Sequence, residues 1–204
     1  MKFFIFLLLA GFLLSAAPFS AAPAQAQAPD SSQTLNRPPP VKTGGLPLNE
    51  ALAGRHSQRS FQSQALTDSQ LSQILWAAFG INRDDSRRTI PTARNQQNLM
   101  VYAVLENGVW LYDGAKHQLT KALDGNFLSE YGGAPLTLLY AVPDSDGIYG
   151  GTHAGSAYQN AGLYCASENL ANVVKLTGAD KLKGKLKLPD GWQVIIVQSV
   201  GRPG

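Results

Sequence analysis

The sequence predicts an α+β fold, in which a mainly antiparallel sheet is covered by helices. Three features carry this prediction: a well-capped helix that ends at Gly80, a hairpin turn at Asn107-Gly108, and a long helical stretch over 154–174. Helices, a hairpin, a strand, a long helix and a last strand follow one another, and this order suits a sheet with helices packed on it. The 204 residues, 44% of them apolar, are enough for one domain with a sizeable core.

The composition excludes several classes of protein. The net charge is only +3, and no dense tract of lysine and arginine occurs. Nucleic-acid binders have a clustered basic stripe, so we expect no nucleic-acid partner. The single cysteine, Cys165, excludes an internal disulfide and a cysteine-rich zinc site. We expect Cys165 to be a small buried apolar residue, and we expect no metal site.

Residues 1–28 have the features of a cleaved signal peptide. An apolar run at 3–14 is followed by small residues, and 24–28 contains two A-x-A cleavage patterns. The alternative, a retained membrane anchor, needs about 20 apolar residues, and this run is shorter. We therefore expect an exported, periplasmic protein without a stable membrane anchor. Residues 29–45 should form a flexible extended arm over the domain or over a partner subunit, and residues 46–204 the folded domain.

Capping signals define two helices. Residues 46–53 can form a short helix that Gly54 ends. Thr67 and Gln70 form a capping box, in which a hydroxyl and a side-chain amide bond the free backbone N–H groups of the first turn. Apolar residues at helical spacing continue from there to Gly80.

The remaining elements follow from apolar runs and turn residues. The Asn107-Gly108 turn should join the two strands of a hairpin. A loop rich in Gly and Asp and a solvated segment rich in Lys should separate the later elements. The expected elements are strands at 99–105, 109–112, 135–142 and 193–200, the loop at 144–151, a helix at 154–174 and the solvated segment at 181–187.

The clearest chemical signal is the basic cluster from Arg55 to Arg59, Arg-His-Ser-Gln-Arg. Arginine binds phosphate oxygens with two parallel hydrogen bonds, so the cluster could cradle a phosphorylated ligand. A solvated basic turn is the alternative that these residues alone leave open. We expect His117 and His153 to be surface or hydrogen-bonded histidines, because no carboxylate lies in motif spacing to either of them.

Several segments, taken in order, resemble the nitroreductase superfamily of FMN-dependent oxidoreductases, in particular its SagB-type thiazole/oxazole dehydrogenase branch. The resemblance covers about residues 46–203. Its motifs are Arg55–Phe61, Leu66-Thr67 at a helix start, Trp76–Asn82, Pro91–Gln97, Gln159-Asn160 and Leu163–Glu168. Two positions depart from the family pattern: Thr92 stands where Ser is common, and Asn169 where Gly is common.

The resemblance implies a three-layer fold, an intertwined homodimer and FMN bound at the dimer interface. Arg55 and Ser57 would hold the phosphate, His56 would add a backbone or ring contact, and Arg59 would face the N1/O2 edge of the flavin. The partner subunit would supply a second set of residues, and the segment after the long helix would line N5 and O4 with its backbone. The second set is Pro91, Thr92, Ala93 and Asn95, the later segment is Val174, Lys175 and Leu176, and Arg202 or Lys175 would complete the phosphate site.

The function implied is that of an exported oxidoreductase working by ping-pong two-electron transfer. A small organic substrate and an electron donor would use the same flavin in turn, and no side chain would act as a catalytic acid or nucleophile. Outside the cytoplasm the donor could be a quinol, a flavin or a small redox protein rather than NAD(P)H. Two alternatives stay open: a non-catalytic flavin-binding periplasmic protein, and a structural module whose arginines pair with acidic residues.

Overall fold

The computed structural model describes residues 33–204. The predicted signal peptide at 1–28 and the start of the predicted arm lie outside the described residues. Within the described part of the chain, none of the helices is both long enough and apolar enough to cross a bilayer.

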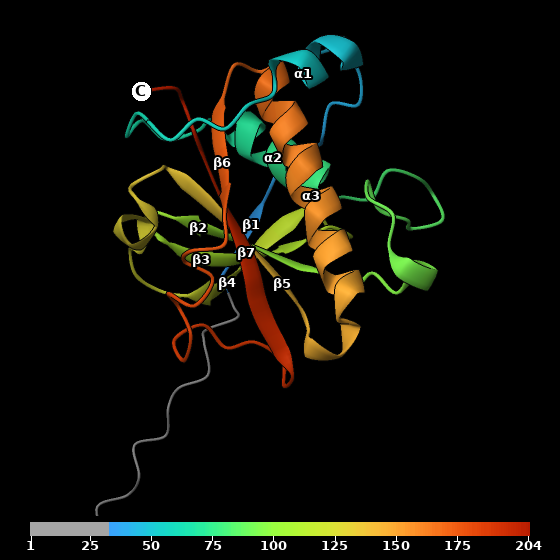
Figure 1. Ribbon diagram of the computed structural model, residues 1–204, viewed down its shortest axis with the longest axis vertical. Coiled ribbons are helices and arrows are strands. Elements are labelled where there is room, and N and C mark those ends of the chain that lie inside the picture. Colours follow the sequence, from blue (N-terminus) through green and yellow to red (C-terminus); the bar gives the residue numbers. More distant parts are fainter. Residues whose placement is uncertain (1–32) are drawn as a thin grey trace, which may run out of the picture.

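The centre of the molecule is a seven-stranded sheet in which all neighbouring strands run antiparallel (Figure 1). The strand order is β1-β4-β3-β2-β5-β7-β6. Within residues 33–204, α2 and α3 pack on the sheet and α1 packs on α3, and this arrangement agrees with the predicted α+β fold. The strands are β1 (Thr34–Asn36), β2 (Met100–Leu105), β3 (Gly108–Asp113), β4 (Gln118–Leu123), β5 (Leu136–Pro143), β6 (Ala171–Lys175) and β7 (Trp192–Gly201), and the helices are α1 (Leu48–Gly54), α2 (Asp68–Phe79) and α3 (Ile148–Ser167).

Both faces of the sheet are buried. Alternate residues of β2 and β5 belong to two separate apolar clusters, one packed against α2 and α3 and the other against the segments around Tyr131 and Leu182. This two-sided burial explains why β5 is a continuous apolar run instead of an alternating one. The prediction that 181–187 is a solvated segment was wrong for its leucines, because Leu182 and Leu186 are buried in the second cluster.

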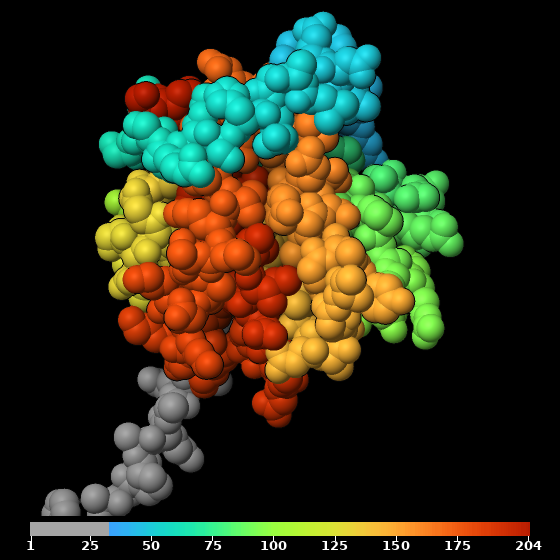
Figure 2. Space-filling view, in the orientation of Figure 1, coloured from blue at the N-terminus to red at the C-terminus, as the bar shows by residue number. Residues whose placement is uncertain are grey.

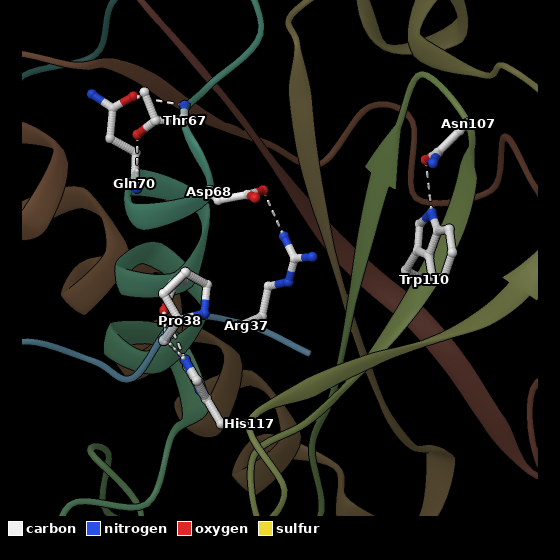
Figure 3. Close-up of polar contacts among 9 residues, drawn as sticks. Arg37, Pro38, Thr67, Asp68, Gln70, Asn107, Trp110 and His117 are labelled. Atoms are coloured by element: carbon white, nitrogen blue, oxygen red, sulfur yellow. Dashed lines mark hydrogen bonds and ion pairs between the residues drawn. The ribbon is translucent and has the colours of Figure 1, made fainter. Parts of the chain in front are cut away.

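The capping signals predicted the helix starts well. The Thr67 hydroxyl accepts the Gln70 N–H, and the Gln70 side chain accepts the Thr67 N–H, which confirms the capping box (Figure 3). The predicted hairpin is also confirmed, with β2 and β3 paired across the turn at Asn107. Buried Cys165 makes no disulfide, and burial raises the pKa of its thiol to about 12.

The predicted bounds of the long helix, 154–174, were wrong at both ends. It begins at Ile148, inside the segment expected to be a loop, and it ends at Ser167, so that Ala171–Lys175 forms strand β6 instead of the last helical turns. Asn169 ends the helix in a left-handed conformation (φ 53°), and the next N–H, of Leu170, donates to the Cys165 carbonyl (2.8 Å). Asparagine adopts this conformation more readily than most residues. Strands β1 and β4 were not predicted.

The described part of the predicted N-terminal arm, residues 33–45, lies along the helices of its own chain. After β1 pairs with β4, Arg37 forms an ion pair with Asp68 (3.0 Å) at the start of α2. The Val41 backbone exchanges two hydrogen bonds with the Gln73 side chain. Several weak contacts along its length therefore dock the arm.

Candidate functional site

Backbone hydrogen bonds hold the first basic motif, Arg55–Phe61, beside the edge of the sheet. The Gln58 N–H donates to the carbonyl of Asn172 in β6 (2.9 Å). Further on, the Gln62 N–H donates to the Arg202 carbonyl (3.0 Å), and the Gly204 N–H to the Ser60 carbonyl (3.1 Å). The motif thus runs between β6 and the last residues of the chain.

Three arginines gather around this segment. Among residues 33–204, none of Arg55, Arg59 and Arg202 forms an ion pair. The Nε atom of Arg202 is buried and has no hydrogen-bond partner within that part of the chain. Gly162 of α3 leaves room for the stem of Arg55, since a Cβ there would stand 3.7 Å from its Cδ. The chain end that carries this buried, unpaired guanidinium nitrogen bonds the backbone of the motif that contains Arg55 and Arg59. Such a nitrogen suits an anionic group such as a phosphate.

His56 and Ser57 are exposed, and the His56 ring is occupied locally. Its Nδ1 lies 2.7 Å from the Gly54 carbonyl oxygen, and its Nε2 lies 2.8 Å from the Gln58 amide nitrogen. The carbonyl can only accept, so Nδ1 carries the proton and Nε2 accepts from Gln58. With both ring nitrogens used, the backbone of His56 is left for the predicted ligand contact.

The predicted backbone segment at Val174, Lys175 and Leu176 begins in β6, at the edge of the sheet. Side chains alternate along a strand, and the ammonium of Lys175 reaches the Tyr131 carbonyl on the side away from α3 (2.9 Å). Burial lowers the pKa of Lys175. Of the two late basic residues predicted to complete a phosphate site, Arg202 is the one beside the first motif. Leu176 is 75% exposed, and Val174 is half-buried.

The second motif, Pro91–Gln97, lies in a loop with unusual backbone geometry. Arg94, Asn95 and Gln97 all have positive φ, between 52° and 56°. The Gln97 N–H donates to the Thr92 hydroxyl (3.2 Å) and thereby closes the turn. Non-glycine residues in this region cost free energy, and such strain gathers at functional sites. Pro91 and Asn95 are exposed, whereas Thr92 and Ala93 are partly buried.

A histidine from α3 fixes this loop. The Ala93 N–H donates to the Nε2 of His153 (2.9 Å). His153 is 2% exposed, and its Nδ1 lies 4.0 Å from a carboxylate oxygen of Asp146. The expectation that His153 is a hydrogen-bonded histidine is confirmed, although a carboxylate that motif spacing did not reveal lies near it. Little in the sequence pointed to this pair, because Asp146 lies in the segment expected to be a loop.

Helix α3 separates the two motifs of one chain. His153 and Asn160, which bond the second-motif loop, are seven residues apart and share one face of α3. Gly162, beside Arg55, is nine residues from His153, which is about two and a half turns and about 14 Å along the axis. The first motif and the Pro91–Asn95 loop therefore lie on opposite sides of α3, as Figures 1 and 2 also show for segments 55–62 and 80–98. One chain does not bring them together.

The nitroreductase family profile matches residues 52–202. The chain belongs to the nitroreductase family. The family-level resemblance in the sequence is thereby confirmed, while the narrower resemblance to SagB-type dehydrogenases stays a prediction.

Solved and curated relatives agree with this assignment. A Ralstonia eutropha crystal structure described as a nitroreductase has a TM-score of 0.79 and 30% identity, covering 86% of this chain and 91% of that one. A Desulfovibrio desulfuricans structure in complex with FMN is similar in fold, with a TM-score of 0.55 and 18% identity over 79% of this chain and 88% of that one. A curated Methanocaldococcus jannaschii protein named as a nitroreductase is 32% identical over 85 residues, which span 39% of this chain and only 43% of that relative.

Proposed function

We propose that this protein is a homodimeric, FMN-dependent oxidoreductase whose two flavin sites are each built from both chains. The observation that carries the proposal is the position of the two motifs on opposite sides of α3. A second copy of the chain would bring its Pro91–Asn95 loop to the first motif. FMN is bound by a fold relative, and the free arginines of the first motif suit its phosphate.

The residues of the chain would divide the work on the cofactor. Arg55, Ser57 and Arg202 would hold the phosphate, and the edge of β6 would offer backbone groups beside the ring. When bound, FMN supplies two-electron chemistry, taking a hydride from a donor and passing it to an acceptor. Arg59 at the N1/O2 edge would stabilise the negative charge that builds up there on reduction.

The expected location of the protein limits which electron donors it can meet. Residues 1–28 support export, and a periplasmic enzyme would meet little nicotinamide cofactor. We therefore propose a quinol, a flavin or a small redox protein as the physiological donor. Fast reduction of the FMN-loaded protein by NADPH alone, among a panel of donors, would contradict this part of the proposal.

The second candidate is a flavin-binding protein without turnover. Bound FMN that no reductant bleaches would select this candidate.

The deciding experiment tests whether residues of both motifs are needed to retain FMN. The mature protein is incubated with FMN and desalted, and its visible spectrum is compared with those of Arg55→Ala/Arg59→Ala, Asn95→Ala and the exposed control Lys187→Gln. We expect flavin to be retained by wild type and the control and lost by the other two variants.

Mixing the two defective variants then tests the dimer. In a heterodimer of Arg55→Ala/Arg59→Ala with Asn95→Ala, one of the two sites has all its residues intact. Flavin retention should therefore return after the variants are unfolded and refolded together. If the mixture stays colourless while sedimentation detects dimers, the two motifs do not serve one site.

A further inference from the structure

A pocket of about 490 Å³ lies in the second-motif loop and is lined mainly by arginine. We call it the arginine pocket. Four of its eight lining residues are arginines, and none is acidic. They are Arg83, Arg87, Arg88, Ile90, Pro91, Thr92, Arg94 and Asn95. None of these arginines belongs to the predicted FMN contacts, although three neighbours, Pro91, Thr92 and Asn95, do.

Arg88 is fixed in the wall of the pocket. Its Nε donates to the Gln97 side chain (2.7 Å), a second nitrogen donates to the Phe79 carbonyl (3.3 Å), and the guanidinium lies over the Phe79 ring at 4.6 Å. Burial lowers the pKa of Arg88, and the neighbouring Tyr112 and Asp113 oppose that effect. A cation is thus held rigidly at the base of the loop.

The other three arginines are exposed and less engaged. Arg87 pairs with Asp85 (3.3 Å), and the Arg83 side chain donates to the Asn82 side chain (3.1 Å). Arg94 makes no ion pair or side-chain hydrogen bond within residues 33–204. Asp146, which lines a neighbouring pocket beyond Arg94, instead faces His153 and accepts from Asn98.

The backbone holds this loop in shape. Ile81 and Arg88 form an antiparallel bridge, and the Asn82 N–H donates to the Arg87 carbonyl (3.2 Å). The loop is closed at its base, so its arginines are presented by an ordered segment. Guanidinium groups that converge on one pocket repel one another, and an anion between them would relieve that repulsion.

We infer that the arginine pocket binds the anionic group, a carboxylate or a phosphate, of a small molecule that reacts at the flavin. The inference rests on the proposed function, because the same loop carries Pro91, Thr92 and Asn95 to the partner's cofactor. The Thr92 hydroxyl accepts from Gln97, which leaves its own proton free to donate to such a group. The anion would anchor the molecule while the rest of it lies over the flavin ring.

The anion could belong to the electron acceptor or to the electron donor, and two pairs of probes separate them. For the acceptor, 4-nitrobenzoate is compared with uncharged 4-nitrobenzamide. For the donor, NADPH is compared with uncharged 1-benzyl-1,4-dihydronicotinamide. The test variant is Arg83→Gln/Arg94→Gln, which leaves the packed Arg88 in place. The control, Lys116→Gln/Lys187→Gln, also removes two positive charges, but from exposed positions outside the pocket.

For at least one pair, the test variant should lower the ratio of kcat/KM for the charged over the uncharged probe. Since charge-assisted hydrogen bonds are stronger than neutral ones, we expect a fall of about tenfold or more. The control should leave both ratios as in wild type. The pair that responds identifies the anion as belonging to acceptor or donor. If neither ratio changes, or if the variant loses FMN affinity in proportion, the arginine pocket is not a substrate site.

Calorimetric titration of 4-nitrobenzoate and of NADPH into flavin-free protein provides a readout without turnover. Weaker binding of the anionic probe to the test variant than to the control supports the pocket even if the protein proves to have no turnover. Failure of wild type to retain FMN would overturn the proposed function alone. Equal binding of both anions by the two variants would overturn the pocket alone.

Discussion

Two irregular segments pack on the helices, and each is fastened by a histidine in the opposite chemical role. His153 accepts the Ala93 N–H and so holds the second-motif loop. His117 holds the arm: its Nε2 lies 2.9 Å from the Pro38 carbonyl oxygen, which can only accept (Figure 3). Its Nδ1 lies 2.8 Å from the Tyr112 hydroxyl. His117 is therefore a donor to the arm, and His153 is an acceptor from the loop.

The two segments also differ in the number of side-chain contacts that hold them in place. The arm is held additionally by Ser72, whose hydroxyl donates to the same Pro38 carbonyl (2.6 Å), by Gln73, and by the bond from the Leu46 N–H to the Ser167 hydroxyl (2.7 Å). The loop is strained by left-handed residues. Within residues 33–204 its fully buried side-chain anchor is His153, which the partly buried Asn160 assists at the Thr89 carbonyl (3.2 Å). Substitutions in the loop anchor should therefore cost more than those in the arm.

The largest effect should come from His153→Leu. Leucine fills similar space but leaves the partly buried Ala93 N–H without an acceptor, which costs about 1–3 kcal/mol of unfolding free energy. FMN affinity should fall as well, because Pro91 to Asn95 lose their anchor. Urea unfolding and flavin titration measure the two effects.

His153→Gln is the matched control, because its side-chain oxygen can still accept from Ala93. It should retain more than half of the stability and flavin affinity that His153→Leu loses. Equal losses in the two variants would mean that packing around α3, not the hydrogen bond, holds the loop.

The next effect is expected from Gly45→Ala in the arm. Gly45 has φ +79°, and a Cβ there would stand 2.7 Å from the Ser167 hydroxyl that receives the Leu46 N–H. Left-handed backbone costs residues other than glycine about 1–2 kcal/mol. The loss of unfolding free energy cannot exceed what docking of the arm contributes, because the arm would then detach. Gly54→Ala, with no positive φ and open space around it, is the control and should not destabilise. Urea midpoints compare the two.

A smaller effect should appear with pH through His117. Burial is the main cause that lowers the pKa of His117; the bond to Pro38 opposes it, and the charge of Arg37 adds to it. The unfolded chain then binds the proton more readily than the folded one. Stability should be complete above a pH of about 6.5 and should fall as pH drops through the lower folded-state pKa.

The readout for this prediction is the difference between wild type and His117→Gln, since other groups also titrate. Gln can still donate to Pro38 but has no charge change. Urea midpoints of the variant should depend less on pH between 5 and 7 than those of wild type. A steeper dependence in the variant would contradict the role given to His117.

Local signals in the sequence predicted local structure well. The Thr67–Gln70 capping box and the Asn107-Gly108 turn act within a few residues, so their elements could be found from the chain alone. Strand β1 could not, because three residues with one partly buried side chain form a strand only by pairing with β4. The burial of Leu182 likewise depends on a sheet face assembled from distant segments.

In the candidate site, too, the contiguous features could be predicted from the sequence, and those assembled from distant segments could not. The first basic motif is contiguous and was visible as a charge cluster. The arginine pocket was not, because its arginines, at 83, 87, 88 and 94, have no regular spacing and converge only when the loop adopts its left-handed turns. The link between His153 and Ala93 spans 60 residues and has no sequence pattern.

The smallest effect should come from Asp68→Asn, which removes the charge facing Arg37 at the start of the arm. The Asp68 side chain is 77% exposed, although that of Arg37 is only 8% exposed. Ion pairs whose carboxylate stays solvated contribute about 0–1 kcal/mol and weaken with salt. Asn keeps an oxygen that can accept from Arg37, so the midpoint of unfolding should shift little at low salt and not at all at 1 M salt. A loss larger than that of Gly45→Ala would mean that this one pair, not the set of contacts along the arm, docks the segment. The contrast with the loop anchored by His153 would then disappear.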